Sequence, residues 1–440
     1  MIKKITNNKL FFIGVHIAFG FLGTLEIFSK VFGLSAVLFP FYVIYSNNNK
    51  NEEAFLFASY IVGAEVFIRM TGGFFLYETC KYAVILYLLQ GLLLRGLKNK
   101  IAIQYLLYIF LLLIGILFTN VPEGESLRKN ILFNLSGPIG LGIAAFYFYQ
   151  REITRKQLYD ALFFMLLPLL SMVVYIYFRT PDLKEIVFGG EANFLTSGGF
   201  GPNQVATAIG LGIFILTIFI FSKYKLTGFI LIDAFFLIYF IFRGLLTFSR
   251  GGVITALIVV IAFAFFYLLY HRGNTESLFK YLLVGIFFTL AIWMYTLDVT
   301  GGMLNNRYTG KNAAGVQKDI TTGRVDLLSL QVENFFDHPL GIGVGNGKYE
   351  RLKKVEHITG TSHSEVGRLL EEHGVIGLFL LFLLLSIPLF NFYRSNNFQR
   401  AFIASFYLLW FLTINHSAMR IALPGFIYAL SLINIVEIDE

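Results

Sequence analysis

Two arginines and one histidine stand beside long apolar runs, in settings that suit an anion site with a proton acceptor. Arg250 lies in residues 246–252, which read LTFSRGG, at the mouth of an apolar run. Arg324 follows a Thr-Thr-Gly turn, and His363 lies in the sequence SHSE. A guanidinium group is a planar donor to anionic oxygens, and an imidazole changes charge near neutral pH. Together these residues predict a site that binds an anion and moves a proton.

The residues around Arg324 predict a short amphipathic helix. Thr321 or Thr322 can cap a helix that begins near Arg324, and the sequence DHP at 337–339 ends it. We expect this helix to lie on the membrane surface. Arg324 is then in the first turn, where a cation opposes the helix dipole. This unfavourable position of a cation indicates that Arg324 binds an anion.

His363 is expected at the start of a second helix. Ser362 and Glu365 have the spacing of a capping box, which makes His363 the first helical residue. A helix N-terminus disfavours the protonated ring, so we expect a neutral imidazole that can accept a proton. Ser364 and Glu365 follow it directly, and we take both as candidate substrate-binding residues.

Ser249 and Asn203 are further candidate substrate-binding residues. Ser249 adds a hydroxyl beside Arg250, and Gly251 and Gly252 leave room for a ligand close to the backbone. Asn203 follows a turn that reads SGGFGP, and its amide either caps the next helix or contacts a polar substrate. Arg250 itself is either a substrate ligand or an anchor that reaches the membrane interface.

A metal site is the rival interpretation of the same polar stretch. The possible ligands there are Asp319, Asp326, Asp337, His338, Glu356, His357 and His363. No pair of them has a known ligand spacing such as His-Glu-x-x-His. The single cysteine, Cys80, excludes a cysteine cluster. We therefore predict no metal and no cofactor.

The composition places these residues in a membrane protein. Hydrophobic residues make up 56% of the chain and charged residues only 14%, far from the balance of a soluble domain. The net charge is +8, but the Lys and Arg residues sit in short clusters between apolar runs. This is the positive-inside pattern and not a nucleic-acid-binding surface. We predict an all-α polytopic integral membrane protein that has membrane lipids as partners and binds no nucleic acid.

Apolar windows predict about 12–14 transmembrane helices, with about 14 as the best count. They cover residues 10–28, 31–46, 54–68, 79–95, 101–119, 131–149, 158–178, 204–222, 226–243, 252–270, 279–297, 374–393, 401–415 and 420–436. With the N-terminus inside, basic loops such as 150–157 and 394–400 face the cytoplasm. The longest polar stretch then faces the other side.

This topology divides one membrane domain into three parts. Residues 1–298 form an N-terminal block of transmembrane helices, and residues 374–440 form the C-terminal transmembrane helices. Between them, residues 299–373 form one large, partly helical periplasmic segment. ATP and nucleotide sugars are absent from that side, so a reaction there requires a substrate that arrives already activated.

Ionisable residues inside the apolar runs need partners or a function. Glu65 and Arg69 are four residues apart in one run, and Glu78 and Lys81 begin the next. These residues either pair with one another or line a substrate path. Asp233 is expected to be buried and hydrogen-bonded.

Taken in order, the motifs resemble those of the O-antigen ligase and O-antigen polymerase superfamily. The similarity rests on LTFSRGG at 246–252, on Gly323-Arg324 leading to HPLGIG at 338–343, and on SHSE at 362–365 leading to EHGVIG at 372–377. GPNQ at 201–204 is similar to a turn common in that family. The resemblance covers about residues 197–385.

The resemblance implies transfer of a saccharide from an undecaprenyl-diphosphate carrier to an acceptor hydroxyl on a lipid or glycan. The reaction would take place at the periplasmic face of the bacterial inner membrane. His363 would be the general base on the hydroxyl. Arg250 and Arg324 would bind the diphosphate and stabilise its charge as it leaves. Such a transfer needs no metal, and a single displacement would invert the anomeric carbon.

The sequence leaves three candidate functions open. Two of them are transfer reactions that differ in the acceptor, and the third is transport. A ligase would join a finished glycan to lipid A–core or a related acceptor. A polymerase would join undecaprenyl-linked repeat units of O-antigen, capsule or exopolysaccharide. A transporter of lipid-linked glycans is expected to show repeated halves and broken helices near the membrane centre, and the sequence has no evident internal repeat.

Overall fold

The computed structural model describes residue 5 and residues 7–96, 101–271, 275–319, 321, 323–355 and 362–436. Most of these residues are helical. The α-helices are α2 (Lys9–Leu22), α3 (Glu26–Ser46), α4 (Glu53–Met70), α5 (Thr79–Arg95), α6 (Ile103–Ile114), α7 (Leu127–Phe148), α8 (Arg155–Arg179), α9 (Pro202–Phe221), α10 (Ile230–Leu246), α11 (Arg250–Tyr270), α12 (Thr275–Val299), α13 (Met303–Thr309), α14 (Arg324–Asp337), α15 (Gly347–Lys354), α16 (Glu365–Arg394), α17 (Asn397–His416) and α18 (Leu423–Leu430).

The remaining regular elements are short. Two 3-10 helices, η1 (Gly115–Phe118) and η2 (Leu195–Ser197), lie in connections. Strands β1 (Glu152–Thr154) and β2 (Asn434–Val436) pair in parallel. The prediction of an all-α polytopic membrane protein is confirmed.

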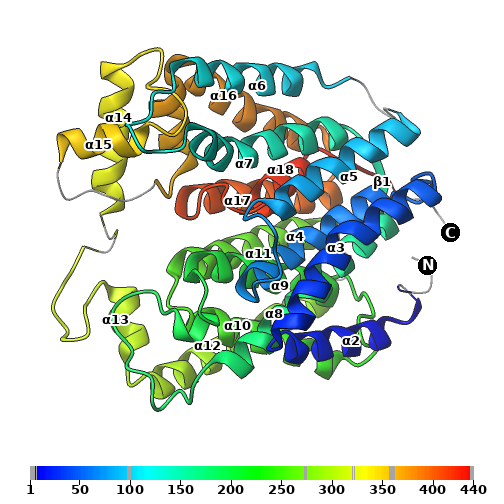
Figure 1. The fold of residues 1–440 in the computed structure, drawn as a ribbon. Helices are drawn as coiled ribbons and strands as arrows, with labels where there is room; N and C mark the ends of the chain where they lie inside the picture. Colours follow the sequence, from blue (N-terminus) through cyan, green and yellow to red (C-terminus); the bar gives the residue numbers. More distant parts are fainter. Residues whose placement is uncertain are drawn as a thin grey trace.

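The long helices run roughly side by side, and the short helices gather at one end of the bundle. Figure 1 shows α13, α14 and α15 at that end and β1 at the opposite end. In the interior, α11 packs against α9 and α17, and α18 packs against α7. The basic loop predicted at 150–157 contains β1, so it lies away from the polar stretch, as the topology requires.

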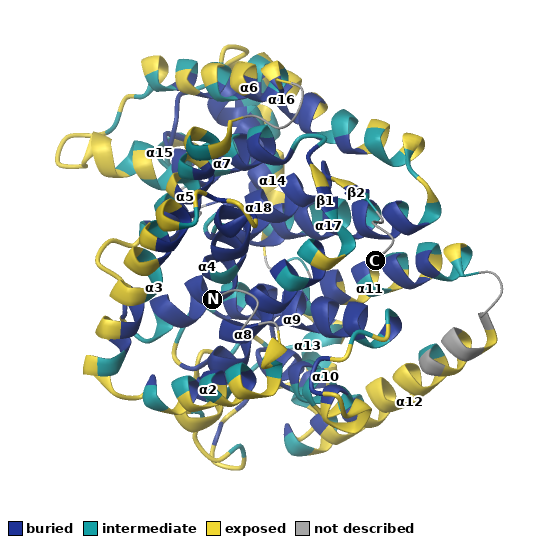
Figure 2. Cartoon of the chain, turned by 90° about the vertical axis from the view of Figure 1, so that its right-hand side faces the viewer, coloured by how far each residue is buried: buried dark blue, intermediate teal, exposed yellow. Residues whose placement is uncertain are grey.

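The core contains charged residues as well as apolar ones. Helix α4 is buried along almost its whole length, and Figure 2 shows it at the centre of the bundle while α12 stands exposed at the edge. Within α4, Arg69 Nη2 lies 2.6 Å from Glu65 Oε1. The Arg69 Nη1 donates to the backbone oxygen of Arg420 at 3.1 Å. The interpretation of Glu65 and Arg69 as a structural pair is therefore the one that the contacts support.

Three other ionisable residues of the apolar runs, Glu78, Lys81 and Asp233, also have partners. Lys81 Nζ donates to Ser136 Oγ at 2.9 Å, and Ser136 Oγ donates to Glu78 Oε2 at 3.0 Å. Asp233 Oδ1 accepts hydrogen bonds from both the backbone and the hydroxyl of Thr227. The expectation that Asp233 is buried and hydrogen-bonded is confirmed.

Each predicted apolar window contains a helix, but not every helix is a long apolar span. By length and composition, seven of the described helices can cross a membrane: α3, α7, α8, α9, α11, α12 and α16. Helices α2, α5, α6 and α10 have 14, 17, 12 and 17 residues. Helix α4 is long enough but contains Glu53, Glu65 and Arg69. The count of about fourteen spans thus exceeds the number of long apolar helices, because hydropathy windows ignore helix ends and buried ion pairs.

The last predicted span, 420–436, needs a correction. Its only helix in the described chain is α18, with eight residues, or roughly 12 Å at the α-helical rise. The chain nevertheless returns to the start of α17, since Gln399 Nε2 donates to the backbone oxygen of Ile433 at 3.1 Å. This return is a broken segment packed inside the bundle and not a continuous transmembrane helix.

Breaking the buried pair in α4 tests its structural role. Arg69→Met leaves the Glu65 carboxylate buried without its partner, and we expect the protein to lose about 3–5 kcal/mol of unfolding free energy. Adding Glu65→Leu should recover part of this loss. The measurement is the thermal unfolding of detergent-purified protein. The matched control is Lys30→Met, which breaks the exposed pair with Glu26 in α3; an equal effect of both substitutions would contradict the role.

Candidate active site

A cavity of about 360 Å³ lies at the end of the bundle that carries α13 and α14. Its walls come from α9, α11, α13, α14, α17 and the residues before α16. It brings together six of the seven predicted site residues: Asn203, Ser249, Arg250, Arg324, His363 and Ser364. These residues are up to 161 positions apart in the chain, so the cavity is a product of the fold.

Four helices begin at this cavity. Asn203 is in the first turn of α9, Arg250 is the first residue of α11, Arg324 is the first residue of α14, and Ser364 is the N-cap of α16. The N-terminal end of a helix carries unpaired N–H groups and a partial positive charge. Convergence of four such ends favours an anion in the cavity.

Arg250 and Arg307 hold each other's helices in place. The Nη1 of Arg250 donates to the backbone oxygen of Arg307 at 3.2 Å. In return, the Nε of Arg307 donates to the backbone oxygen of Phe248 at 2.8 Å. Phe248 has a φ of 55°, so the turn before α11 adopts a left-handed conformation that this contact helps to hold. The two guanidinium groups are thereby fixed at one wall of the cavity.

Arg324 is positioned by the turn before α14. Gly323 is the N-cap and has a φ of 75°, which favours glycine. Its N–H donates to Asp319 Oδ2 at 2.7 Å, and the Thr321 hydroxyl donates to the same oxygen at 2.6 Å. The prediction that Thr321 caps the helix is therefore wrong, because its hydroxyl is used by Asp319; Thr322 lies outside the described residues. The predicted helix itself is confirmed, from Arg324 to Asp337.

The arginines of the cavity repel one another. Burial, Arg250 and Arg324 together lower the pKa of Arg307 to about 10, and burial and Arg250 lower the pKa of Arg324. Both groups stay protonated at pH 7. Among the described residues that line the cavity, none is an aspartate or a glutamate. The cavity is thus strongly positive until an anion enters it.

His363 precedes α16 and is not part of it. The N-cap is Ser364, whose hydroxyl accepts a hydrogen bond from Gly367 N, and the helix begins at Glu365. The predicted capping box from Ser362 is therefore wrong. The Ser362 hydroxyl instead accepts from Ser364 N at 3.1 Å and from Gln331 Nε2 at 2.9 Å. Because Gln331 of α14 and the backbone of Ser364 engage the Ser362 hydroxyl, Ser362 does not cap α16.

The imidazole of His363 is neutral at pH 7, but not for the predicted reason. Burial is the largest cause that lowers its pKa to about 4, followed by the positive charges of Arg420 and Arg324 and by His416. No described residue is hydrogen-bonded to its ring nitrogens. The ring can therefore accept a proton from a molecule in the cavity.

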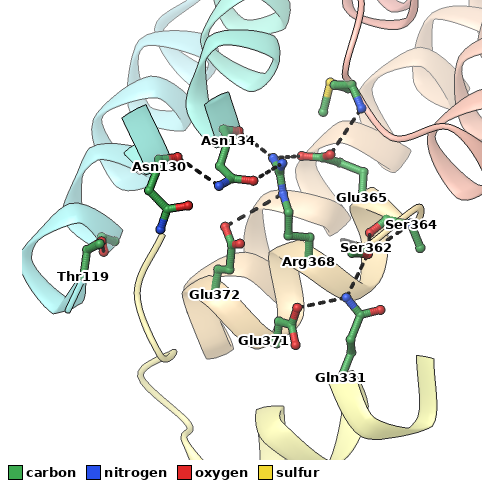
Figure 3. A network of polar contacts seen from close by, with 12 residues as sticks. Thr119, Asn130, Asn134, Gln331, Ser362, Ser364, Glu365, Arg368, Glu371 and Glu372 are labelled. Carbon is green, nitrogen blue, oxygen red and sulfur yellow. Dashed lines mark hydrogen bonds and ion pairs between the residues drawn. The ribbon is translucent and has the colours of Figure 1, made fainter. Parts of the chain in front are cut away.

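The loop that carries His363 is held from two sides. The guanidinium of Arg420 donates to the backbone oxygen of Ser362 at 3.0 Å, and Ala418 N donates to the His363 oxygen at 3.0 Å. From the other side, Gln331 contacts Ser362 and also donates to Glu371 at 3.0 Å, as Figure 3 shows. This support fixes the backbone next to the ring.

Asn203 and Ser249 form one polar pair in the cavity wall. The Ser249 hydroxyl donates to Asn203 Oδ1 at 2.8 Å. The alternative that Asn203 caps α9 is wrong, because the N-cap is Gly201 and no side-chain cap bond is present. The amide nitrogen of Asn203 is left for a polar substrate. Elsewhere in the cavity lining, the Ser364 hydroxyl donates to Asn415 Oδ1 at 3.2 Å.

Glu365 is the one predicted site residue that does not line the cavity. Its carboxylate is buried and lies 2.5 Å from Arg368 Nη2, and Arg368 also donates to Asn134 in α7 (Figure 3). Glu365 thus holds Arg368, which ties α16 to α7, and Glu365 is not among the residues that line the cavity.

The glycines beside Arg250 serve helix packing, and Gly251 also lines the cavity, as expected for ligand approach. A Cβ on Gly251 would lie 2.6 Å from the His416 ring, and one on Gly252 would lie 2.5 Å from the Ala206 backbone. Both glycines let α11 approach α17 and α9 closely. The glycine run at 341–347 is also tightly packed, since the N–H of Gly343 donates to the Glu372 oxygen at 3.1 Å.

The sequence motifs did not mark several cavity residues as parts of the site, among them Arg307, Gln331 and Asn415. Arg307 follows an apolar run in the sequence NNRY, which is the same signal that marked Arg250. In the described part of the chain, no three Asp, Glu, His or Cys side chains are grouped as metal ligands. Glu356 and His357, which the metal interpretation included, lie outside the described residues.

Comparison with known families identifies the domain that holds most of this site. Residues 234–382 match the family model of the O-antigen ligases. This part of the chain is similar to the O-antigen ligases. The resemblance predicted from the motifs is confirmed, and the match includes Arg250, Arg307, Arg324 and His363. No curated protein and no solved structure matched the chain. The similarity to the O-antigen ligases supports a ligase-like or polymerase-like function in general.

A substitution at Gly251 tests the packing explanation. Gly251→Ala forces a methyl group against His416, and we expect it to lower the unfolding free energy by about 1–3 kcal/mol, as for an overpacked core. His416→Ala in the same chain should relieve the clash, so that the double variant is more stable than the sum of single effects.

The thermal unfolding of purified protein measures both effects. The control is Gly285→Ala in α12, where a Cβ meets nothing within 4 Å, and where alanine favours the helix. Purely additive effects of Gly251→Ala and His416→Ala would show that the glycine serves another purpose, such as ligand approach.

Proposed function

We propose that the protein is a membrane glycosyltransferase that transfers a saccharide from undecaprenyl diphosphate to an acceptor hydroxyl. The observation that carries the proposal is the joining of Arg250, Arg324 and the neutral His363 in one cavity, within the part of the chain that is similar to the O-antigen ligases. The two arginines suit the diphosphate, and the imidazole suits the hydroxyl. Three aliphatic residues of α14, Val325, Leu327 and Leu328, line the same cavity and suit the lipid side of the donor.

The transfer is a single displacement at the anomeric carbon. The acceptor oxygen forms a bond to that carbon while its proton passes to a ring nitrogen of His363. The bond from the anomeric carbon to the phosphate oxygen breaks, and its electron pair stays on the diphosphate. Arg250 and Arg324 stabilise the charge that develops there. One displacement inverts the configuration of the anomeric carbon.

Donor binding also prepares the base. In the free protein, the charge of Arg324 contributes to the low pKa of His363. A bound diphosphate offsets that charge and favours the protonated ring. The pKa of His363 therefore rises when the donor is in place, which makes it a stronger base at the moment the acceptor must be deprotonated.

We place the reaction at the periplasmic face of the bacterial inner membrane. The basic loops predicted to be cytoplasmic include 150–157, and β1 in this loop lies at the end of the bundle opposite to α13 and α14. The positive-inside rule then places the cavity on the outer side. Because guanidinium groups supply the charge that a metal would otherwise supply, we propose a transfer that needs no metal, which chelator treatment of the assay tests.

Single substitutions test the assigned residues. Arg250→Gln and Arg324→Gln each remove a charge-assisted donor, and we expect transfer to fall roughly 10²–10³-fold. His363→Asn removes the base, with an expected loss of about 10²–10⁴-fold. The measurement is transfer by purified protein from lipid-linked donor to candidate acceptors. The matched controls are Arg179→Gln and His271→Ala, which lie outside the cavity; full activity in all three site variants would refute the assignment.

The pH dependence of transfer tests the state of His363. The ring is active as a base above its pKa, so the acid limb of kcat/KM should lie near pH 4, as the pKa of about 4 implies. Arg324→Gln removes a positive charge that lowers this pKa, so the limb should move to higher pH. The acid limb of kcat, which reports the donor complex, should lie above that of kcat/KM in the wild type. An acid limb that stays in place in Arg324→Gln but moves in Arg179→Gln would contradict this coupling.

We propose a ligase that acts on lipid A–core or a related acceptor, and glycan analysis of a deletion strain tests this choice. Loss of a ligase leaves polymer on undecaprenyl diphosphate and a bare acceptor. Loss of a polymerase leaves glycans with a single repeat unit. A strain with this one gene deleted shows one of these two glycan patterns and not the other.

A further inference from the structure

The cavity contains a third guanidinium group that the proposed mechanism does not use. Arg307, in α13, lines the cavity together with Arg250 and Arg324. It is near enough to both that their charges lower its pKa. The repulsion from these two charges makes it unfavourable to place the Arg307 guanidinium at the cavity. The contacts of Arg307 show what holds it there.

The anchors of Arg307 hold its side chain without neutralising it. Its Nε donates to the backbone oxygen of Phe248 at 2.8 Å, and its Nη1 donates to the backbone oxygen of Gly190 at 2.9 Å. Both acceptors are neutral carbonyl groups. In the described part of the chain, no residue accepts a hydrogen bond from its Nη2. The guanidinium is thus fixed in orientation, and one of its nitrogens is left for a molecule in the cavity.

Two described carboxylates, Asp319 and Glu191, lie near these arginines, and both are exposed to solvent. Hydrogen bonds from Gly323 and Thr321, together with the charge of Arg250, lower the pKa of Asp319. Glu191 is the one acid among the groups that shift the pKa of Arg307 upward. Its side chain is 83% exposed and lies 4.0 Å from Lys318, so solvent screens it. Three guanidinium groups therefore line the cavity, and the acids beside them are exposed and screened by solvent. An anion with nearly three negative charges is the best electrostatic match.

The charge of the proposed substrate changes during the reaction. A lipid diphosphate that is esterified to a sugar carries about two negative charges. When the bond to the anomeric carbon breaks, the terminal phosphate gains a further ionisable oxygen, and its total approaches about three at neutral pH. Two arginines suffice for the donor, whereas the leaving group requires a third. An interaction that is stronger with the leaving group than with the donor lowers the barrier.

We propose that Arg307 is a catalytic residue that binds the leaving diphosphate and stabilises the charge that appears on it as the glycosidic bond breaks. The proposal rests on the proposed function, since it takes undecaprenyl diphosphate as the leaving group. The bond that breaks and the proton acceptor are those given above. Arg307 supplies charge and hydrogen bonds, and it exchanges neither proton nor electron.

Steady-state kinetics of Arg307→Gln test the proposal. Because the interaction belongs to the transition state, kcat should fall roughly 10²–10³-fold while the KM for the donor changes little. Arg179→Gln is the control and should behave as the wild type. A wild-type kcat in Arg307→Gln, or a raised KM with unchanged kcat, would overturn the proposal.

A binding measurement separates charge recognition from a structural role. The probes are undecaprenyl diphosphate and its terminal methyl ester, which has nearly the same shape but lacks the third charge. The wild type should bind the diphosphate at least roughly tenfold more tightly than the ester, and Arg307→Gln should bind the two equally. Equal binding by the wild type would overturn the proposal even if the variant fails to fold.

The experiments distinguish a wrong proposed function from a wrong role of Arg307. If Arg250→Gln, Arg324→Gln and His363→Asn all retain full transfer, the proposed function is wrong, and Arg307 loses its substrate with it. If those three variants lose transfer and Arg307→Gln retains it, only the role of Arg307 is wrong.

Discussion

The site depends on keeping like charges together in one cavity whose described lining residues include no acid. The structure does this with neutral acceptors, since Arg307 is held by two backbone carbonyl groups and Arg250 donates to the carbonyl of Arg307. The buried acids nearby are already occupied: Glu365 pairs with Arg368 and Glu371 pairs with Arg351. Because these buried carboxylates have their own arginines, they do not cancel the positive field of the cavity, and the nearby Asp319 and Glu191 are exposed and screened by solvent. An anionic ligand is the group that can relieve it.

The buried ion pairs have a second consequence, because they connect the membrane interior to the site. Arg69 in α4 donates to the backbone oxygen of Arg420, and the guanidinium of Arg420 donates to the backbone oxygen of Ser362. Ser362 directly precedes His363. The position of the proposed base thus depends on a pair in the centre of the bundle. Such a chain of rigid contacts explains how the loop before α16 gains a fixed geometry, which loops on their own lack.

The fold class and most of the site could be predicted from the sequence, since apolar runs mark helices and isolated cations at their ends mark a polar function. What could not be predicted depends on contacts between distant segments. The sequence SHSE offers two caps, and Gln331 of α14 decides between them by engaging Ser362. Gly251 does line the cavity, but the sequence could not show that the ring of His416, 165 positions later, packs against it. Arg307 has no local feature that separates it from an interfacial anchor. Helix α18 ends early because the chain turns to pair β2 with β1, which no hydropathy window detects.

The same electrostatics that bind the donor set the order of the proposed reaction. In the free protein, burial and nearby arginines keep His363 neutral but make it a weak base. A weak base does not deprotonate an acceptor alcohol, so the acceptor alone is not activated. Once a diphosphate offsets the arginines, the imidazolium is favoured, and proton transfer to His363 becomes easier. The base is therefore strongest when the anomeric carbon is already in the cavity. Loss of the diphosphate after transfer restores the low pKa, which returns the proton to solvent and resets the site.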